Sequence, residues 1–398
     1  MRPLTNRFER LGTETAFKVG ADAAAWAAQG NKVYPFHLGD MNIPTPEHIV
    51  EAAMAGIRAG KTGYAPGPGI MPLREALAAN ISAARGMSLD ANQIAVQPGG
   101  KPTISKFLAM VLEEGMGALY PNPGYPIYES QIEFLGGKAL PYGYTPTEDG
   151  FAINRDEIES QIDENTTVLI YNDYQNPIGA ESSPEERQWL ADLAIKHDLW
   201  VLSDEAYYDI RYSGKSSSIA ALPGMAERTV ILYTFSKKFA MTGWRLGCAA
   251  GPADVIDGIG KFNTNIESCS NHFVQMAGIA ALQGPDEPQQ AIVAELKRRR
   301  DALVEQLQKI DGVQVACPET TFYLFPDVTE IYKRKGYDSS YDFRMDALKQ
   351  TGVSFCSREH FGRPLPGEDR VFIRFAYSGI NVDQIEEGLA KLKAFWER

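Results

Sequence analysis

Three short, continuously apolar stretches in the middle of the chain constrain the fold more than any other feature. They are residues 168–171, 199–202 and 230–233. None of them alternates polar with apolar residues, which is typical of strands buried on both faces of a mainly parallel sheet. Residues 184–197 predict a helix between the first two, because Pro184 lies near its start and apolar residues share one face. This strand–helix–strand order predicts an α/β domain.

The C-terminal part of the chain predicts a second, smaller unit. A long helix is expected at residues 288–310, strands at 322–325 and 371–373, and a terminal helix at 382–396. A chain of 398 residues is long enough for two domains. We therefore expect three segments: residues 1–48 joining the small domain, 49–287 forming the large domain, and 288–398 forming the rest of the small domain.

Charge and composition exclude several classes of partner. The net charge of -12 disfavours nucleic acid and anionic membranes, which need a basic face. No apolar run is long enough to span a bilayer, and residues 1–11 lack the apolar core of a secretory signal. The four cysteines form no C-x-x-C pair, and the histidines show no metal-ligand spacing. We expect a cytoplasmic protein without a metal site.

Unusual polar chemistry follows four of the predicted strands. In an open α/β sheet, functional groups gather at the carboxyl ends of the strands. The four stretches are residues 97–101 (QPGGK), 172–179 (NDYQNPIG), 203–207 (SDEAY) and 234–247 (TFSKKFAMTGWRLG).

Taken alone, the first two stretches are ambiguous. Gly99 and Gly100 open a predicted helix whose first amide N–H groups are free to hold an anion, although glycine pairs more often make simple turns. The Asn-Pro pair at residues 176–177 favours a structural turn.

The other two stretches carry a carboxylate and an amine in apolar surroundings. Asp204 ends a buried strand, so it needs either a salt bridge or a protonated ring nitrogen. Lys237 lies among aromatic and apolar residues, where we expect its pKa to be lowered and its amine to be free to attack an aldehyde. With the anion cradle and Arg245, these groups match what pyridoxal phosphate requires.

At this point the chain resembles the class I/II aminotransferases, the aspartate aminotransferase family of fold-type I pyridoxal enzymes, over nearly its whole length. The motif that supports this resemblance most strongly is residues 236–247, SKKFAMTGWRLG. The others are residues 203–207, 176–179, 64–69 with 73–74, 123–128 and 373–375. The resemblance implies a large domain with a mainly parallel sheet between helices, plus a smaller α+β domain.

The resemblance also implies roles for individual residues. Lys237 binds the cofactor covalently and moves the substrate proton, and its spacing to Arg245 selects it over Lys238. The remaining cofactor contacts are Asp204 on the ring nitrogen, Tyr207 and Asn176 on the ring oxygen, Tyr125 on the ring face, and Gly100, Lys101, Thr234, Ser236 and Arg245 around the phosphate. The implied substrate contacts are Arg374, Gly39 and Asn176. Tyr64 is similar to the tyrosine that reaches the neighbouring subunit's phosphate, which implies a homodimer with shared active sites.

The implied reaction is a ping-pong transfer of an amino group from an L-amino acid to a 2-oxo acid. Lys101 resembles a lysine that binds the distal carboxylate of dicarboxylic substrates, which favours aspartate or glutamate with 2-oxoglutarate. Alternatively, Lys101 is only a helix N-terminal residue near the phosphate. Two rival functions are a related pyridoxal lyase, such as a C–S lyase, and a catalytically silent pyridoxal-binding regulatory protein.

The sequence departs from the family's pattern at three places. Ile178 replaces the common Thr, Asp-Met-Asn occupies residues 40–42, and residues 173–175 are larger than usual. These departures affect the substrate expected, not the cofactor.

Overall fold

A seven-stranded sheet forms the centre of the molecule. The computed structural model describes residues 2–148 and 150–398. The strand order is β2-β10-β9-β8-β7-β3-β4. The strands are β2 (Ile94–Gln97), β3 (Gly117–Pro121), β4 (Lys138–Tyr142), β7 (Thr166–Tyr171), β8 (Trp200–Asp204), β9 (Thr229–Thr234) and β10 (Gly247–Ala250). All neighbouring strands from β9 to β4 are parallel, and β10 is antiparallel to both β9 and β2. The predicted mainly parallel sheet is confirmed.

The three apolar stretches are the adjacent strands β7, β8 and β9. Alternate residues of β9 enter different apolar clusters: Ile231 and Tyr233 join one, and Val230 and Leu232 join the other. Since successive side chains of a strand point to opposite faces, both faces of the sheet are buried. This double burial explains why these strands lack polar alternation.

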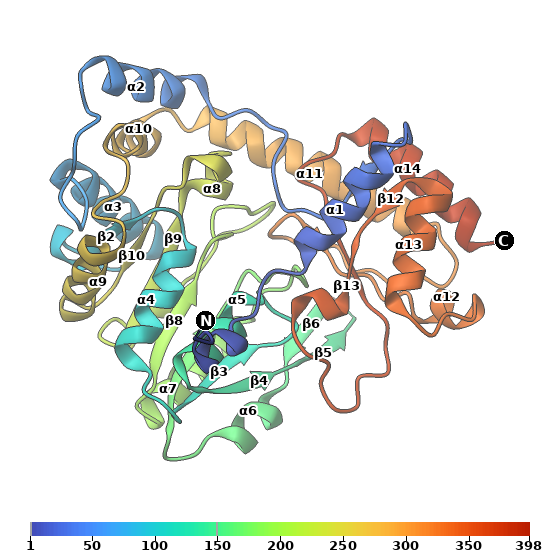
Figure 1. The fold of residues 1–398 in the computed structure, drawn as a ribbon, viewed down its shortest axis with the longest axis horizontal. Helices are drawn as coiled ribbons and strands as arrows, with labels where there is room; N and C mark the ends of the chain where they lie inside the picture. The colour runs from blue at the N-terminus through green and yellow to red at the C-terminus, as the bar shows by residue number, and fades with distance from the viewer. Residues whose placement is uncertain (1, 149) are drawn as a thin grey trace.

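Helices cover both faces of the sheet (Figure 1). The helices that share apolar clusters with one face are α2 (Glu47–Arg58), α3 (Met71–Arg85), α6 (Arg155–Gln161), α7 (Pro184–Lys196) and α10 (His272–Gln283). Those that share a cluster with the other face are α4 (Lys101–Val111), α5 (Ile127–Leu135) and α9 (Ala253–Ile266). The helix predicted at residues 184–197 is α7, which ends one residue earlier.

A long helix, α11 (Glu287–Gln308), leads from this sheet to a second unit, as Figure 1 shows in gold. That unit contains the small sheet β11-β14-β13, with β11 (Tyr323–Leu324), β13 (Cys356–Ser357) and β14 (Ile373–Ala376). Its helices are α12 (Thr329–Arg334), α13 (Ser340–Thr351) and α14 (Val382–Trp396). The terminal helix was predicted with these bounds, whereas β11 is shorter than predicted and β14 begins later.

Residues 16–36 of the N-terminal segment pack on the C-terminal unit, whereas the short helix η1 (Asn6–Arg10) lies against α5 of the large unit. Strand β1 (Tyr34–Pro35) pairs in parallel with β12 (Val353–Ser354), and α1 (Ala16–Ala27) lies beside α13 (Figure 1). Tyr34 and Phe36 belong to the same apolar cluster as Trp396. On this packing we propose the three-part division at residues 48 and 287. Among the described residues, no helix has the length and apolarity needed to cross a membrane.

Candidate functional site

A cavity of about 440 Å³ lies where β7, β8, β9 and the start of α4 meet the second unit. It brings together nearly all of the predicted site residues. Those that line it are Gly39, Gly100, Lys101, Tyr125, Asn176, Asp204, Tyr207, Thr234, Ser236, Lys237, Arg245 and Arg374. Tyr64 is the exception, because its side chain is 89% exposed on the surface and lies outside this lining.

Lys237 presents a partly desolvated amine to the cavity. It lies in the single-turn helix α8 (Phe235–Lys238), directly after β9, and its Nζ donates to the carbonyl oxygen of Gly39 at 2.9 Å. The rings of Phe322 and Tyr207 lie 5.3 and 5.9 Å from the amine. Burial lowers the pKa of Lys237 to about 8. A larger fraction of this amine is therefore uncharged near neutral pH than is usual for lysine.

The adjacent Lys238 has a different environment. Its Nζ lies 2.9 Å from Oδ1 of Asp209, and both side chains are largely buried. Lys238 is absent from the cavity lining. The structure thus distinguishes the two lysines: Lys238 is held in an ion pair, and Lys237 faces the cavity.

Asp204 is a buried carboxylate at the end of β8. It accepts hydrogen bonds from the hydroxyl of Tyr128 at 2.6 Å and from the amide N–H of Ala206 at 3.1 Å. No cation of residues 2–148 or 150–398 forms an ion pair with it. Burial raises the pKa of the Asp204 carboxyl. Such a group gains most from a positively charged donor supplied by a ligand.

Backbone amides, hydroxyls and a guanidinium gather at the start of α4. Gly100 caps this helix, and the Oγ atoms of Thr234 and Ser236 lie 2.9 Å apart. A Cβ atom on Gly99, where φ is +95°, would lie 2.0 Å from Nη2 of Arg245. Glycine at residue 99 therefore permits both the turn and the close approach of the guanidinium. Together these donors form a cradle suited to a phosphate-sized anion.

Arg374 offers a buried guanidinium from the middle of β14. It is only 3% exposed, and its guanidinium carbon lies 4.5 Å from the ring centres of both Tyr323 and Phe361. It donates to Asn176 Oδ1 at 2.9 Å and to the His37 carbonyl oxygen at 2.6 Å. Its Nε has no protein partner, and no carboxylate of the described chain pairs with it. A buried cation of this kind fits a carboxylate ligand.

Four further residues belong to the site although the sequence analysis gave none of them a role. Tyr128 bonds to Asp204, and the Tyr323 hydroxyl lies 2.7 Å from that of Tyr207. Asp40 and Glu14 also line the cavity. Tyr128 lies within the stretch 123–128 that carries the family resemblance. Its nearness to Tyr125, the expected contact on the cofactor ring, was the signal that could have identified it. Tyr323 and Glu14 carried no such signal, because distant segments bring them to the cavity.

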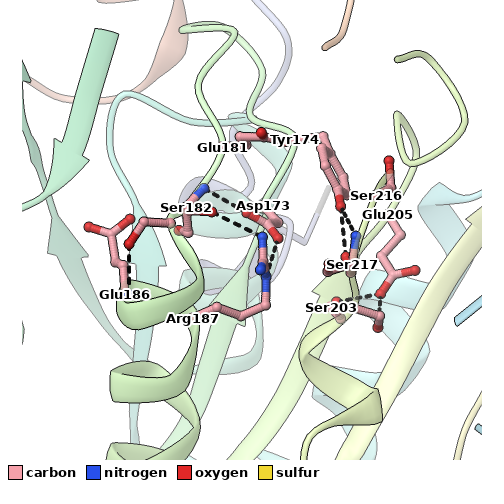
Figure 2. Close-up of polar contacts among 12 residues, drawn as sticks. Asp173, Tyr174, Glu181, Ser182, Glu186, Arg187, Ser203, Glu205, Ser216 and Ser217 are labelled. Carbon is pink, nitrogen blue, oxygen red and sulfur yellow. Dashed lines mark hydrogen bonds and ion pairs between the residues drawn. The ribbon is translucent and has the colours of Figure 1, made fainter. Parts of the chain in front are cut away.

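The unusual turn at residues 173–175 is stabilised by contacts outside the cavity. Asp173 accepts from Arg187 Nε at 2.8 Å and from the amide N–H of Ser182 at 2.8 Å, as Figure 2 shows. The Tyr174 hydroxyl donates to the Ser217 carbonyl oxygen at 2.7 Å. This departure from the family's pattern therefore supports the position of Asn176 and contributes no side chain to the cavity lining.

The comparisons with known proteins agree with this geometry. Residues 32–392 match the family "Aminotransferase class I and II". The aspartate aminotransferase of Bacillus subtilis (strain 168) is 30% identical over 397 residues, covering 99% of each chain. Aromatic-amino-acid aminotransferase 2 of Thermococcus litoralis is 34% identical over 364 residues, covering 89% of this chain and 91% of its own. The solved aspartate aminotransferase from Thermus thermophilus with maleate has a TM-score of 0.90 at 28% identity, covering 99% of this chain and 100% of its own.

An open α/β sheet with these groups at its strand ends thus defines an amino-group-transferring enzyme. The chain belongs to the class I and II aminotransferase family. The predicted family, fold class and enzyme class are confirmed.

Proposed function

We propose that this aminotransferase binds pyridoxal phosphate through Lys237 and moves an amino group from an L-amino acid to a 2-oxo acid. One observation carries the proposal: the amine of Lys237 and the unpaired carboxylate of Asp204 line the same cavity. When bound, the cofactor supplies a protonated ring that takes up electrons as a substrate Cα bond breaks.

The cavity residues fit this cofactor. The cradle of Gly100, Thr234, Ser236 and Arg245 suits the phosphate, and an unpaired Asp204 suits a protonated ring nitrogen. Tyr128 orients Asp204 through its hydroxyl. The remaining proposed contacts are Tyr125 on the ring face, Tyr207 and Asn176 on the ring oxygen, and Lys101 near the phosphate.

Substrate is oriented by Arg374 and the proton is moved by Lys237. The guanidinium of Arg374, fixed by Asn176 and the two aromatic rings, holds the α-carboxylate as a fork. The Lys237 amine takes the proton from the substrate Cα, since its pKa of about 8 lies close to neutral pH. The Gly39 carbonyl oxygen accepts a hydrogen bond from this amine and holds it at the cavity.

We propose dicarboxylic substrates, with aspartate or glutamate as donor and 2-oxoglutarate as acceptor. Lys101 lines the cavity at the start of α4, where an ammonium can reach a distal carboxylate. Similar proteins are named aspartate aminotransferases, which supports this choice. The test is the activity of Lys101→Ala towards aspartate and towards alanine. A loss confined to aspartate supports contact of Lys101 with the distal carboxylate. An equal loss for both substrates rules that contact out.

We also propose a homodimer with shared active sites. Tyr64 is exposed outside the cavity of its own chain, near the end of α9, where Ala65 N–H contacts the Cys269 sulfur at 3.3 Å. Exposed apolar residues on α2, α3 and α9 are suited to such a contact: Met54, Ile57, Met71 and Ile266. Sedimentation gives the oligomeric state. Mixing Tyr64→Ala and Lys237→Ala subunits should restore activity only if Tyr64 serves the neighbouring site.

The proposal is tested by reducing the purified enzyme with borohydride and mapping the labelled peptide. We expect the tag on Lys237 and none on Lys238, together with a spectral shift when an L-amino acid is added without a 2-oxo acid. A colourless protein, or a tag on another lysine, would overturn the assignment.

A further inference from the structure

Glu14 has no assigned role, yet its side chain lines the same cavity as Lys237 and Arg374. It lies between the short helix η1 (Asn6–Arg10) and α1, in a stretch without regular secondary structure. A shift of this segment therefore breaks no backbone hydrogen bond within a helix or strand.

The Glu14 carboxylate already forms an ion pair with Lys101. Its Oε1 accepts a hydrogen bond from the Tyr125 hydroxyl at 2.7 Å and forms an ion pair with Lys101 Nζ. The Glu14 side chain is 18% exposed and that of Lys101 is 48% exposed, so solvent screens the pair only in part. The lysine proposed to bind a distal carboxylate thus already holds a carboxylate from its own chain.

This pairing matters for a ping-pong enzyme, because one cavity must accept two different substrates in turn. A distal carboxylate that reaches Lys101 meets the like charge of Glu14, and two carboxylates beside one ammonium repel each other. A substrate with an uncharged side chain leaves the Glu14–Lys101 pair intact, so no charge is left without a partner.

We propose that Glu14 determines substrate specificity by exchange of carboxylates at Lys101. Glu14 stays on Lys101 when the substrate side chain is uncharged, and the distal carboxylate of a dicarboxylic substrate displaces it. This inference rests on the proposed function, since it takes Arg374 as the α-carboxylate contact. It predicts that one cavity serves both neutral and dicarboxylic substrates, with Glu14 weakening binding of the latter.

The test compares Glu14→Gln with Glu9→Gln, a control on the same N-terminal segment that carries an exposed carboxylate. Calorimetry of the holoenzyme measures the Kd of maleate, an unreactive dicarboxylate, and of propionate, a monocarboxylate. We expect Glu14→Gln to bind maleate more tightly, by about fivefold, as removal of one partly exposed competing charge allows. The Kd of propionate, and both values in Glu9→Gln, should stay unchanged.

A double-mutant cycle with Lys101→Ala makes the test specific. If Glu14 acts through Lys101, Glu14→Gln has no effect on maleate binding in the Lys101→Ala background. Glu14→Asp, which keeps the charge but shortens its reach, should shift maleate binding in the same direction as Glu14→Gln. Thermal unfolding of each variant identifies any that is not folded, and the remaining variants decide the result.

Three outcomes would overturn the exchange. They are an unchanged maleate Kd in Glu14→Gln, an equal shift for maleate and propionate, and an undiminished effect without Lys101. Weaker binding of lysine-like donors with unchanged maleate would make Glu14 a contact for a distal ammonium instead, which also overturns it. Failure of the proposed function looks different: no tag on Lys237 and no spectral shift with any amino acid.

Discussion

Two regions of this molecule hold buried charges whose partners differ. Outside the cavity lining, Arg85 Nε lies 2.5 Å from Glu205 Oε2, and Arg187 pairs with Asp173. Inside the cavity, Asp204 is equally buried but has no cation of the described chain beside it. Asp204 and Glu205 are adjacent in sequence, so a single step along the chain separates a structural charge from one available to a ligand. Burial alone therefore does not identify a functional group, whereas a buried charge without an oppositely charged partner does.

The two regions also differ in what their charges do for stability. Removing one member of a buried ion pair leaves the other member without compensation and costs the folded state several kcal/mol. An unpaired charge at a ligand site already destabilises the ligand-free protein, and only the bound ligand offsets that cost. Four substitutions test this contrast.

The largest effect is expected from Lys237→Ala. Loss of the amine that takes the substrate proton should lower kcat by about 10⁴-fold. Lys238→Arg is the matched control, because it keeps a cation beside Asp209 and should leave the rate unchanged. Steady-state rates of both variants decide this, and a Lys237→Ala enzyme that retained most of its turnover would contradict the assignment.

Among the buried ion pairs outside the cavity, Arg187→Met should destabilise the fold without changing the active site. It leaves the buried Asp173 carboxylate without its cation, and we expect a loss of about 3–5 kcal/mol in the free energy of unfolding. Arg228→Met is the control, since its partner Asp198 is 94% exposed and such pairs contribute about 1 kcal/mol at most. Urea denaturation measures both, and equal losses in the two variants would remove the contrast.

Among the cavity charges without an ion-pair partner, Arg374→Lys should weaken substrate binding by about 100-fold. An ammonium cannot hold a carboxylate as a fork, and it cannot also reach Asn176 and the His37 carbonyl oxygen. Arg370→Lys is the control, because Arg370 is a half-exposed residue 3.5 Å from Asp327. The KM for the amino donor measures the effect, and similar KM values in both variants would argue against a carboxylate contact at Arg374.

The groups at the strand ends could be predicted from sequence because each follows a recognisable apolar run. Asp204 is the last residue of β8 and Lys237 lies in the turn of helix that follows β9, and local order along the chain was enough to place them. Tyr323 and Glu14 could not be predicted in this way. Their positions depend on packing between segments far apart in the chain, such as the contact of Tyr323 with Tyr207.

The fold was predictable to a similar extent. The terminal helix has a strong apolar period and was predicted with the bounds of α14. The direction of β10 was not predictable, because its four residues, GCAA, carry no signal that distinguishes antiparallel from parallel pairing. The single turns η4 (Thr242–Trp244) and α8 reverse the chain between β9 and β10, and tertiary packing sets that reversal.

The smallest and most discriminating effect is expected from Asp204→Asn in the cofactor-free protein. Asparagine can accept from the Ala206 N–H through Oδ1 and donate to the Tyr128 hydroxyl oxygen through Nδ2 while removing a buried charge, so we expect a gain of about 0.5–2 kcal/mol in the free energy of unfolding at pH 7. Because burial raises the pKa of Asp204, its ionisation destabilises the fold. The gain should vanish below about pH 4, where the carboxyl is protonated in both states, and grow as the pH rises through the raised pKa.

Glu205→Gln is the matched comparison and should lose stability at pH 7, since Arg85 then lacks its partner. Opposite signs for these neighbours in urea titrations would confirm the contrast, and a loss of stability in both would refute it.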